Sequence, residues 1–212
     1  MKIALINENS QAGKNELIFN TLKGVVEPMG HEVYNYGMYT ADDEVQLTYV
    51  KAGLLTAILI NSGAADFVIT GCGTGEGAML ACNAFPKVLC GHIVDPSDAY
   101  MFGQINDGNS IALPFAKGFG WGAELNLQYI FEKLFTGERG QGYPKERVVP
   151  EQANKKILDQ VKEITHKDML TILKEIDQTF LKETVSGAKF QEYFFANCKD
   201  DAIAEYIKGI LA

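Results

Sequence analysis

A run of alternating glycines is the segment of this sequence best equipped for chemistry. It reads Gly71-Cys72-Gly73-Thr74-Gly75-Glu76-Gly77. The glycines let backbone N–H groups turn toward a ligand, and a helix beginning at the end of the loop would add partial positive charge. Cys72 and Glu76 are each able to accept a proton, and Thr74 supplies a hydroxyl group. A thiolate or carboxylate beside a cradle of amides is suited to removing a proton next to a carbonyl and stabilising the resulting oxyanion.

The same loop is open to other interpretations. The spacing Gly73-x-Gly75-x-x-Ala78 fits a loose form of the dinucleotide-binding fingerprint. That fingerprint belongs to the first strand-to-helix turn, however, whereas this loop follows the third predicted strand. A Walker A loop is excluded because no Gly-Lys-Ser/Thr follows. A tight turn with Cys72 as a buried filler stays open, although four alternating glycines exceed what a turn needs.

The loop must be positioned by surrounding strands and helices, and short apolar runs alternate here with helix-length amphipathic stretches. The predicted strands are Lys2–Asn7, Glu32–Tyr36, Phe67–Thr70, Val88–Val94 and Ser110–Pro114. The predicted helices are Lys14–Met29, Asp42–Asn61, Pro96–Phe102 and Trp121–Phe135. This order predicts an α/β fold, a Rossmann-like three-layer sandwich with a five-stranded parallel sheet. Because such sheets bind ligands beyond the carboxyl ends of their strands, we expect binding loops at Asn7–Gly13, Gly71–Gly77, Asp95–Ser97 and Ile105–Asn109.

The composition changes at about Pro150, and no convincing strand follows it. We therefore expect a domain over residues 1–150 and a helical C-terminal extension over residues 151–212. Thr165 and Asp168 resemble a capping box for a helix that reaches Leu181. The extension is expected to pack on the core or on a partner subunit.

The overall composition narrows the classes of partner. The chain has 212 residues, of which 47% are hydrophobic and 22% charged, and its net charge is −8. This acidic balance disfavours nucleic acids and anionic membrane surfaces, because both require a positive field. The four cysteines lack C-x-x-C spacing, so a zinc or dithiol site is not expected. With neither a leader sequence nor a membrane span in view, a cytoplasmic protein is expected.

Three motifs in order resemble those of the ribose-5-phosphate isomerase B / galactose-6-phosphate isomerase family. They are Cys72-Gly73-Thr74-Gly75 followed by Gly77, then Ala81-Cys82-Asn83, then Gln104-Ile105-Asn106-Asp107-Gly108-Asn109. The family pattern is C-G-T-G-x-G, A-A-N-K and Q-H-N-D-x-N, and the spacing matches without a gap. The resemblance covers roughly residues 1–150 and leaves the extension outside the typical short family member.

The resemblance implies an aldose–ketose isomerase that works through a cis-enediolate, without a metal or a nicotinamide cofactor. In the family the cysteine of C-G-T-G moves the proton, and some members instead place a glutamate where Glu76 stands. Thr74 and the loop amides would hold the sugar oxygens; the loop glycines concerned are Gly71, Gly73, Gly75 and Gly77. Asn106 would bind the enediolate in a site built from two subunits of a homodimer, which could pair further into a tetramer.

Departures from the family pattern point to the substrate. The histidine of Q-H-N-D is Ile105 here, and the D-H pair after the first strand is Glu8-Asn9, which we expect to contact the sugar. Of two phosphate-binding arginines, only Arg147 matches, because Tyr143 stands at the position of the other. Arg139 and Lys145 are possible substitutes for the missing arginine.

A phosphate dianion usually binds several charged hydrogen-bond donors, and only one of the family's arginines is matched here. Loss of the ring-opening histidine also favours a substrate that is already open-chain. We therefore expect a carboxylate sugar such as 4-deoxy-L-threo-5-hexosulose-uronate. A phosphorylated pentose or hexose, such as ribose 5-phosphate or galactose 6-phosphate, is the alternative. A non-catalytic sugar- or nucleotide-binding module and a nicotinamide-dependent reductase are the competing classes.

Overall fold

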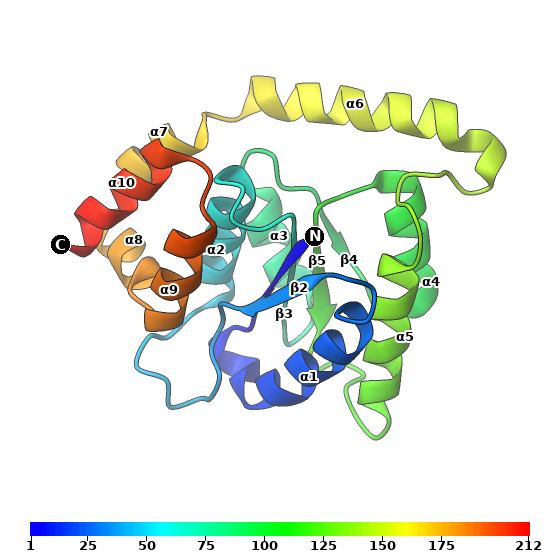
Figure 1. Cartoon of the computed structure of the whole chain (residues 1–212), viewed down its shortest axis with the longest axis horizontal. Helices are drawn as coiled ribbons and strands as arrows, with labels where there is room; N and C mark the ends of the chain where they lie inside the picture. Colours follow the sequence, from blue (N-terminus) through cyan, green and yellow to red (C-terminus); the bar gives the residue numbers. More distant parts are fainter.

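A computed structural model describes residues 1–212 and contains one five-stranded sheet in which every pairing is parallel. In spatial order the strands are β2 (Glu32–Asn35), β1 (Lys2–Ile6), β3 (Phe67–Cys72), β5 (Ser110–Pro114) and β4 (Cys90–His92). Helices cover both faces of the sheet (Figure 1). The predicted α/β sandwich with a helical extension is confirmed.

The central strands are apolar throughout because both of their faces are buried. In β1 the side chains from Ile3 to Ile6 are fully buried and alternate between two hydrophobic clusters. Ile3 and Leu5 pack toward α1 (Asn15–Val26) and α5 (Ala123–Phe135). Ala4 and Ile6 pack toward the opposite face, which α2 (Tyr49–Asn61) and α3 (Glu76–Asn83) cover. α4 (Pro96–Met101) lies beside α5.

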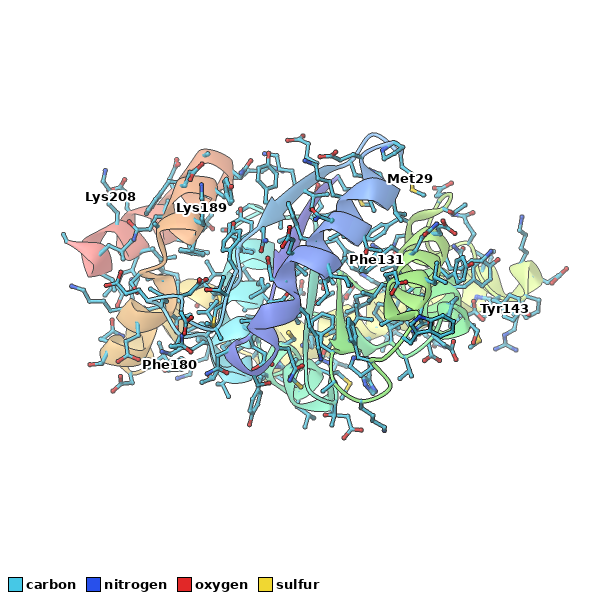
Figure 2. The ribbon with its side chains drawn as sticks, turned by 90° about the horizontal axis from the view of Figure 1, so that it is seen from below. Met29, Phe131, Tyr143, Phe180, Lys189 and Lys208 are labelled. Atoms are coloured by element: carbon cyan, nitrogen blue, oxygen red, sulfur yellow. The ribbon has the colours of Figure 1, made fainter.

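The extension consists of five helices. They are α6 (Val148–Thr165), α7 (Met169–Glu175), α8 (Gln178–Val185), α9 (Ala188–Asn197) and α10 (Asp201–Leu211). The last four gather beside α2 at one end of the molecule, whereas α6 is a long separate arm (Figure 1). Figure 2 shows Phe180, Lys189 and Lys208 at this end and Tyr143 at the other. α2 lies between the sheet and this bundle, so side chains on all its sides are buried, among them Leu54, Leu55 and Ile58.

Two predicted helix starts are wrong. The helix expected from Asp42 begins at Tyr49, because Thr48 caps it and the Asp43 carboxylate is occupied by the amides of Tyr39 and Thr40 in a preceding turn. The predicted capping box at Thr165 does not form, since Thr165 is the last residue of α6. Asp168 itself caps α7.

The helix expected to reach Leu181 is interrupted. It ends at Glu175, and a new helix starts after Asp177, whose carboxylate accepts the Phe180 amide at 2.7 Å. The helical periodicity of the sequence runs across this junction, which is why the pattern alone predicted one helix. The Asp side chain competes locally for backbone N–H groups and so separates the two helices.

All strands of the parallel sheet point the same way. We call the side of the sheet where the strands end its carboxyl edge and the side where they begin its amino edge. The chain leaves β1 toward β2 and then returns to β3 on the other side of β1, so the loops after β1 and β3 diverge at a switch point where ligands of such sheets bind. The expected binding loop at Ile105–Asn109 instead precedes β5 and includes the end of a short π-helical turn, η2 (Phe102–Asn106). This loop therefore lies at the amino edge, and its predicted placement at the carboxyl edge is wrong.

Candidate active site

The carboxyl edge brings Glu8 and Cys72 to one face of the sheet. Ile6 pairs in register with Thr70, and the chain stays extended through Glu8, so the next residues on the same face are Glu8 and Cys72. The Glu8 side chain is buried and accepts hydrogen bonds from the backbone amide and hydroxyl of Ser10, at 2.9 and 2.6 Å. Asn9 follows, and its backbone N–H donates to the Leu47 carbonyl at 2.7 Å.

Three of the four glycines in the loop, Gly71, Gly75 and Gly77, have little room for a larger residue. A Cβ at Gly71 would lie 2.3 Å from the Leu113 carbonyl oxygen. Gly75 has a left-handed φ of +82°, and a Cβ there would lie 2.8 Å from the His92 ring. A Cβ at Gly77 would touch the Tyr49 ring at 3.3 Å. The glycine pattern thus reflects close packing as well as ligand access.

Backbone contacts fix the direction of the loop. The Cys72 carbonyl accepts from the Phe115 amide at 2.8 Å, and the Gly73 carbonyl accepts from Ala116 and Lys117 at 3.0 and 2.9 Å. His92, at the end of β4, lies 2.8 Å by its Nε2 from the Thr74 carbonyl oxygen. These hydrogen bonds hold the loop carbonyls on the β4–β5 side. N–H groups of the loop therefore stay available to a ligand.

The loop offers both free donors and proton acceptors. The amides of Gly73 and Thr74 donate to no group of the chain, whereas the Gly75 amide donates to Cys72 Sγ at 3.2 Å. Cys72 is half-buried, and Glu76 and Thr74 are exposed. Gly75 is the N-cap of α3, so the loop stands at a helix N-terminus. This arrangement stabilises negative charge on a ligand oxygen beside the thiol.

Two further predicted site residues lie at the amino edge. Asn106, in η2, is exposed and makes no side-chain hydrogen bond within the chain. Arg147 immediately precedes α6, is mostly exposed, and has its Nε 3.6 Å from the Glu151 carboxylate. Since β5 is five residues long, the two edges are separated by roughly 13 Å of strand. Within one chain, therefore, Asn106 and Arg147 do not join the glycine loop.

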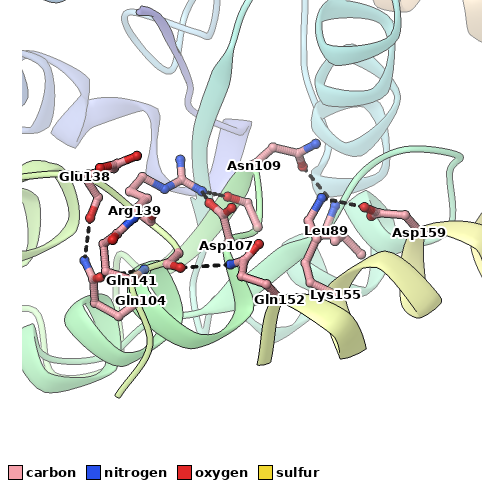
Figure 3. Close-up of polar contacts among 12 residues, drawn as sticks. Leu89, Gln104, Asp107, Asn109, Glu138, Arg139, Gln141, Gln152, Lys155 and Asp159 are labelled. Atoms are coloured by element: carbon pink, nitrogen blue, oxygen red, sulfur yellow. Dashed lines mark hydrogen bonds and ion pairs between the residues drawn. The ribbon is translucent and has the colours of Figure 1, made fainter. Parts of the chain in front are cut away.

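Arg139 does not take the place of the missing arginine. Its guanidinium pairs with Asp107 at 3.2 Å, donates to the Gly108 carbonyl and lies 4.7 Å from the Phe67 ring centroid. Burial lowers the pKa of Arg139, and the Asp107 carboxylate opposes that shift. Figure 3 shows Arg139 and Asp107 in a polar cluster with Gln104, Gln141 and Gln152, beside α6. Asp107, with a φ of +46°, and Arg139 together brace the turn before β5.

Several motif residues have structural contacts. The side-chain amide of Asn83 holds the start of β4. Its nitrogen donates to the Cys90 carbonyl at 2.8 Å, and its oxygen accepts from the Cys90 amide at 3.0 Å. Asn109 accepts from the Leu89 amide at 2.9 Å and donates to the Lys87 carbonyl at 2.7 Å. These side chains position strands and do not point to a ligand.

Sequence reasoning missed two residues near the loop. Tyr49 lies against Gly77 from the first turn of α2. Lys14 bonds Gln11 Oε1 at 2.8 Å and the Phe115 carbonyl, and its Nζ lies 4.5 Å from the Phe119 ring centroid. Lys14 ends the turn η1 (Asn9–Lys14) that follows β1, so its position after the first strand was the available signal. The chain gathers no group of three His, Cys, Asp or Glu side chains fit for a metal ion.

The doubly covered parallel sheet and the amide-rich loop after β3 are typical of α/β proteins that bind small molecules. A family model described as ribose/galactose isomerase matches residues 3–148, and the chain belongs to that family. A second model, described as ribose-5-phosphate isomerase, matches residues 164–210. The chain is accordingly an aldose–ketose isomerase.

Solved structures extend the resemblance over the whole chain. A 4-deoxy-L-threo-5-hexosulose-uronate ketol-isomerase complexed with a tartrate is 67% identical, with 100% of this chain and 99% of that chain covered and a TM-score of 0.98. A ribose-5-phosphate isomerase from Vibrio parahaemolyticus is 53% identical, with the same coverage and a TM-score of 0.97. A ribose-5-phosphate isomerase B from Clostridium thermocellum, 23% identical, shares the fold over 77% of this chain and 98% of its own, with a TM-score of 0.60. A search of curated proteins finds no match. None of the helices is both long and apolar enough to cross a membrane.

Proposed function

We propose that the protein isomerises an open-chain sugar acid, 4-deoxy-L-threo-5-hexosulose-uronate, between its aldose and ketose forms. The observation that supports this substrate is the small number of arginines available to bind an anion. Of the two arginines, only Arg147 is mostly exposed, with one ion pair to Glu151, whereas Arg139 is held by Asp107 and the Gly108 carbonyl. A carboxylate needs fewer charged donors than a phosphate dianion. The 67% identical relative is named for this sugar acid and was solved with tartrate, itself a hydroxylated dicarboxylate.

The chemistry requires one base and one oxyanion site. A base removes the proton from the carbon next to the carbonyl, and the electron pair moves onto the carbonyl oxygen to give an enediolate. The free amides of Gly73 and Thr74 stabilise that oxygen. The hydroxyl proton on the adjacent oxygen passes to the enediolate oxygen, the adjacent oxygen becomes the new carbonyl, and the same proton carrier returns its proton to the carbon that was the carbonyl. Thr74 Oγ1 contributes a further hydroxyl contact. No cofactor is required, because the substrate is oxidised at one carbon and reduced at the next.

We assign the base to Cys72 in preference to Glu76. Cys72 is half-buried, and its Sγ accepts a hydrogen bond from the Gly75 amide. It stands at the end of β3, on the same face of the sheet as Glu8 after the neighbouring strand β1. Glu76 is exposed on the first turn of α3. A half-buried base is less solvated by water than an exposed one and so keeps more of its basicity. This difference favours the thiol. Glu8 and Asn9, at the end of β1, are proposed to bind sugar oxygens.

A second copy of the chain is proposed to complete the site. Asn106 and Arg147 lie at the opposite edge of the sheet from Cys72, so they reach a glycine loop only when another subunit presents them. We therefore propose a homodimer in which each site combines the loop of one protomer with these two residues of its partner. The division into residues 1–150 and 151–212 and the cytoplasmic location stay predictions.

The test is a paired assay that offers the enzyme 4-deoxy-L-threo-5-hexosulose-uronate and ribose 5-phosphate separately. We expect turnover of the uronate at a kcat/KM at least a hundredfold above that for the phosphosugar. Turnover of the phosphosugar alone would contradict the proposal and favour the pentose phosphate alternative, which the 53% identical relative and the second family model support. Binding of either sugar without solvent deuterium entering its α-carbon would identify a non-catalytic binding module.

A further inference from the structure

Lys14 places a positive charge at the carboxyl edge of the sheet, on the turn that follows β1. It is the last residue of η1, and its side chain is half-buried. Its Nζ donates to the carbonyl of Phe115, the first residue after β5. Since β3 lies between β1 and β5, this contact joins segments on either side of the strand that carries the glycine loop.

The ammonium group of Lys14 is within reach of a substrate held at Cys72. The Phe115 amide donates to the Cys72 carbonyl at 2.8 Å, and the Phe115 carbonyl accepts from Lys14. Because the nitrogen and oxygen of one residue lie at most about 3.6 Å apart, Lys14 Nζ is within roughly 10 Å of the Cys72 carbonyl oxygen. An extended six-carbon sugar covers about 6 Å. One end of such a substrate can therefore react at Cys72 while the other end contacts Lys14.

No acidic side chain of the protein neutralises this ammonium group. Lys14 takes part in none of the ion pairs of the chain. Its partners are neutral: Gln11 Oε1 at 2.8 Å, the Phe115 carbonyl and the Phe119 ring, whose centroid lies 4.5 Å from Nζ. An ammonium has three N–H donors, and the two oxygen acceptors leave one of them free. Because a half-buried charge without a counter-charge is costly, an anionic ligand is the partner that this site lacks.

The carboxylate of Glu8, at the other end of the same turn, is kept apart from Lys14 by a chain of hydrogen bonds. Glu8 Oε1 accepts from Ser10 Oγ at 2.6 Å, and Ser10 Oγ accepts from Gln11 Nε2 at 3.1 Å. Gln11 Oε1 in turn accepts from Lys14. Two neutral side chains thus stand between the carboxylate and the ammonium. The turn holds both charges at fixed and separate points of the carboxyl edge.

Helix formation does not explain a lysine at this position. Lys14 is the N-cap of α1, and its side chain makes no capping hydrogen bond. Residues that stabilise a helix start have side-chain oxygens that accept from the first backbone amides, and an ammonium has no acceptor. The partial positive charge of a helix N-terminus also repels a cation and attracts an anion. Lys14 and the start of α1 together therefore favour a negative group beside the glycine loop.

We propose that Lys14 binds the carboxylate of the sugar acid and makes the enzyme selective for an acid over a neutral sugar. This assignment rests on the proposed function. One ammonium with a single free N–H suits the single charge of a carboxylate. Lys14 belongs to the same chain as Cys72, so this contact forms without a second subunit, whereas Arg147 reaches a glycine loop only from another copy.

A charged substrate and its neutral counterpart test the contact. Wild type is expected to convert 4-deoxy-L-threo-5-hexosulose-uronate with a kcat/KM at least about tenfold above that for its methyl ester. Lys14→Met should lower kcat/KM for the acid by roughly tenfold to a hundredfold, mainly through KM, and for the ester by less than about threefold. Lys14→Arg keeps the charge and should retain most of the preference. Lys23→Met, which removes the same charge from the last turn of α1, is the matched control and should behave as wild type.

Tartrate gives a readout that does not depend on turnover. Isothermal titration calorimetry should detect tartrate binding to wild type and to Lys23→Met, and at least about tenfold weaker binding to Lys14→Met. Threitol, which keeps the hydroxyl groups of tartrate and lacks its carboxylates, should not distinguish wild type from Lys14→Met. Circular dichroism verifies that each variant is folded.

The outcomes separate substrate binding from support of the turn. Equal losses for the acid and the ester in a folded Lys14→Met would overturn the proposal, because a merely structural lysine affects both substrates alike. Tartrate that binds wild type and Lys14→Met equally well, or binds neither, would overturn it as well. If wild type converts ribose 5-phosphate alone, the proposed function fails, while the tartrate titration still decides whether Lys14 binds a carboxylate.

Discussion

At the scale of single residues, the site depends on where one thiol and one carboxylate stand relative to the same loop. Cys72 is half-buried and its thiol accepts the Gly75 amide, whereas Glu76 is exposed on the first turn of the following helix. Both were candidates for the base on residue type alone. Their different burial separates them, because proton transfer to carbon requires a base that a bound substrate shields from water.

The base is tested by two substitutions. We expect Cys72→Ala to lower kcat by roughly a hundredfold to ten-thousandfold, the usual contribution of a general base. Glu76→Gln should cost less than about tenfold, because its exposed side chain keeps its shape and loses only charge. Initial rates with the uronate measure both. A large loss in Glu76→Gln with near-normal rates in Cys72→Ala would reverse the assignment, and normal rates in both would remove the loop from the chemistry.

At the scale of elements, the loop acts as a rigid connection between β3 and α3. His92 and the β5 backbone hold its carbonyls, and Gly75 supplies the left-handed residue that starts α3. His92, at the end of β4, therefore supports the loop through its contact with the Thr74 carbonyl. This explains why a glycine is needed at position 75 irrespective of substrate.

Gly75→Ala is expected to destabilise the protein by about 1–3 kcal/mol, since it combines left-handed strain with an overlap against the His92 ring. Activity should fall further than stability does, because the amide cradle moves. Thermal denaturation and steady-state rates measure the two effects. Gly24→Ala, in an open position within α1, is the control and should stabilise by up to about 1 kcal/mol. An unchanged Gly75→Ala protein would mean that the loop tolerates a shift.

The helix caps of the extension give a second prediction at this scale. Asp168→Ala and Asp177→Ala should each lower the free energy of unfolding by about 1 kcal/mol through loss of an N-cap. Thr165→Ala should change it by less than about 0.5 kcal/mol, because Thr165 ends a helix and caps none. Urea denaturation distinguishes the three. A large effect at Thr165 alone would mean that the capping box forms in solution.

At the scale of the whole molecule, the two edges of the sheet carry complementary halves of one proposed site. This predicts complementation between two inactive proteins. Cys72→Ala and Asn106→Ala, mixed and allowed to exchange subunits, should recover about a quarter of wild-type activity, since half of the dimers are mixed and each contains one intact site. Cys72→Ala mixed with Thr74→Ala should recover none, because both changes fall on the loop. No recovery in the first mixture would show that one chain contains its whole site.

Local sequence patterns alone predicted the parallel α/β sandwich, the helical extension and the chemical character of the glycine loop. These follow from local patterns, since buried strands must be apolar and a loop that approaches a ligand closely must be glycine-rich. The family motifs also pointed to an isomerase before any contact was known. The breaks at Tyr49 and between α7 and α8 escaped the pattern, because capping by Thr48 and Asp177 depends on backbone geometry that periodicity does not encode.

Which residues lie at the same edge of the sheet became known from the three-dimensional fold and not from the sequence pattern. The segment Ile105–Asn109 was predicted to be a binding loop at the carboxyl ends of the strands, yet its place before β5 sends it to the opposite edge from Cys72. Arg139 resembled an anion ligand until burial against Phe67 and Asp107 showed it to be structural. The direction of the apolar face that Ile157, Val161 and Ile164 form on α6 was equally hidden, because periodicity gives the spacing of a helical face but not whether that face meets the core of its own chain or is exposed.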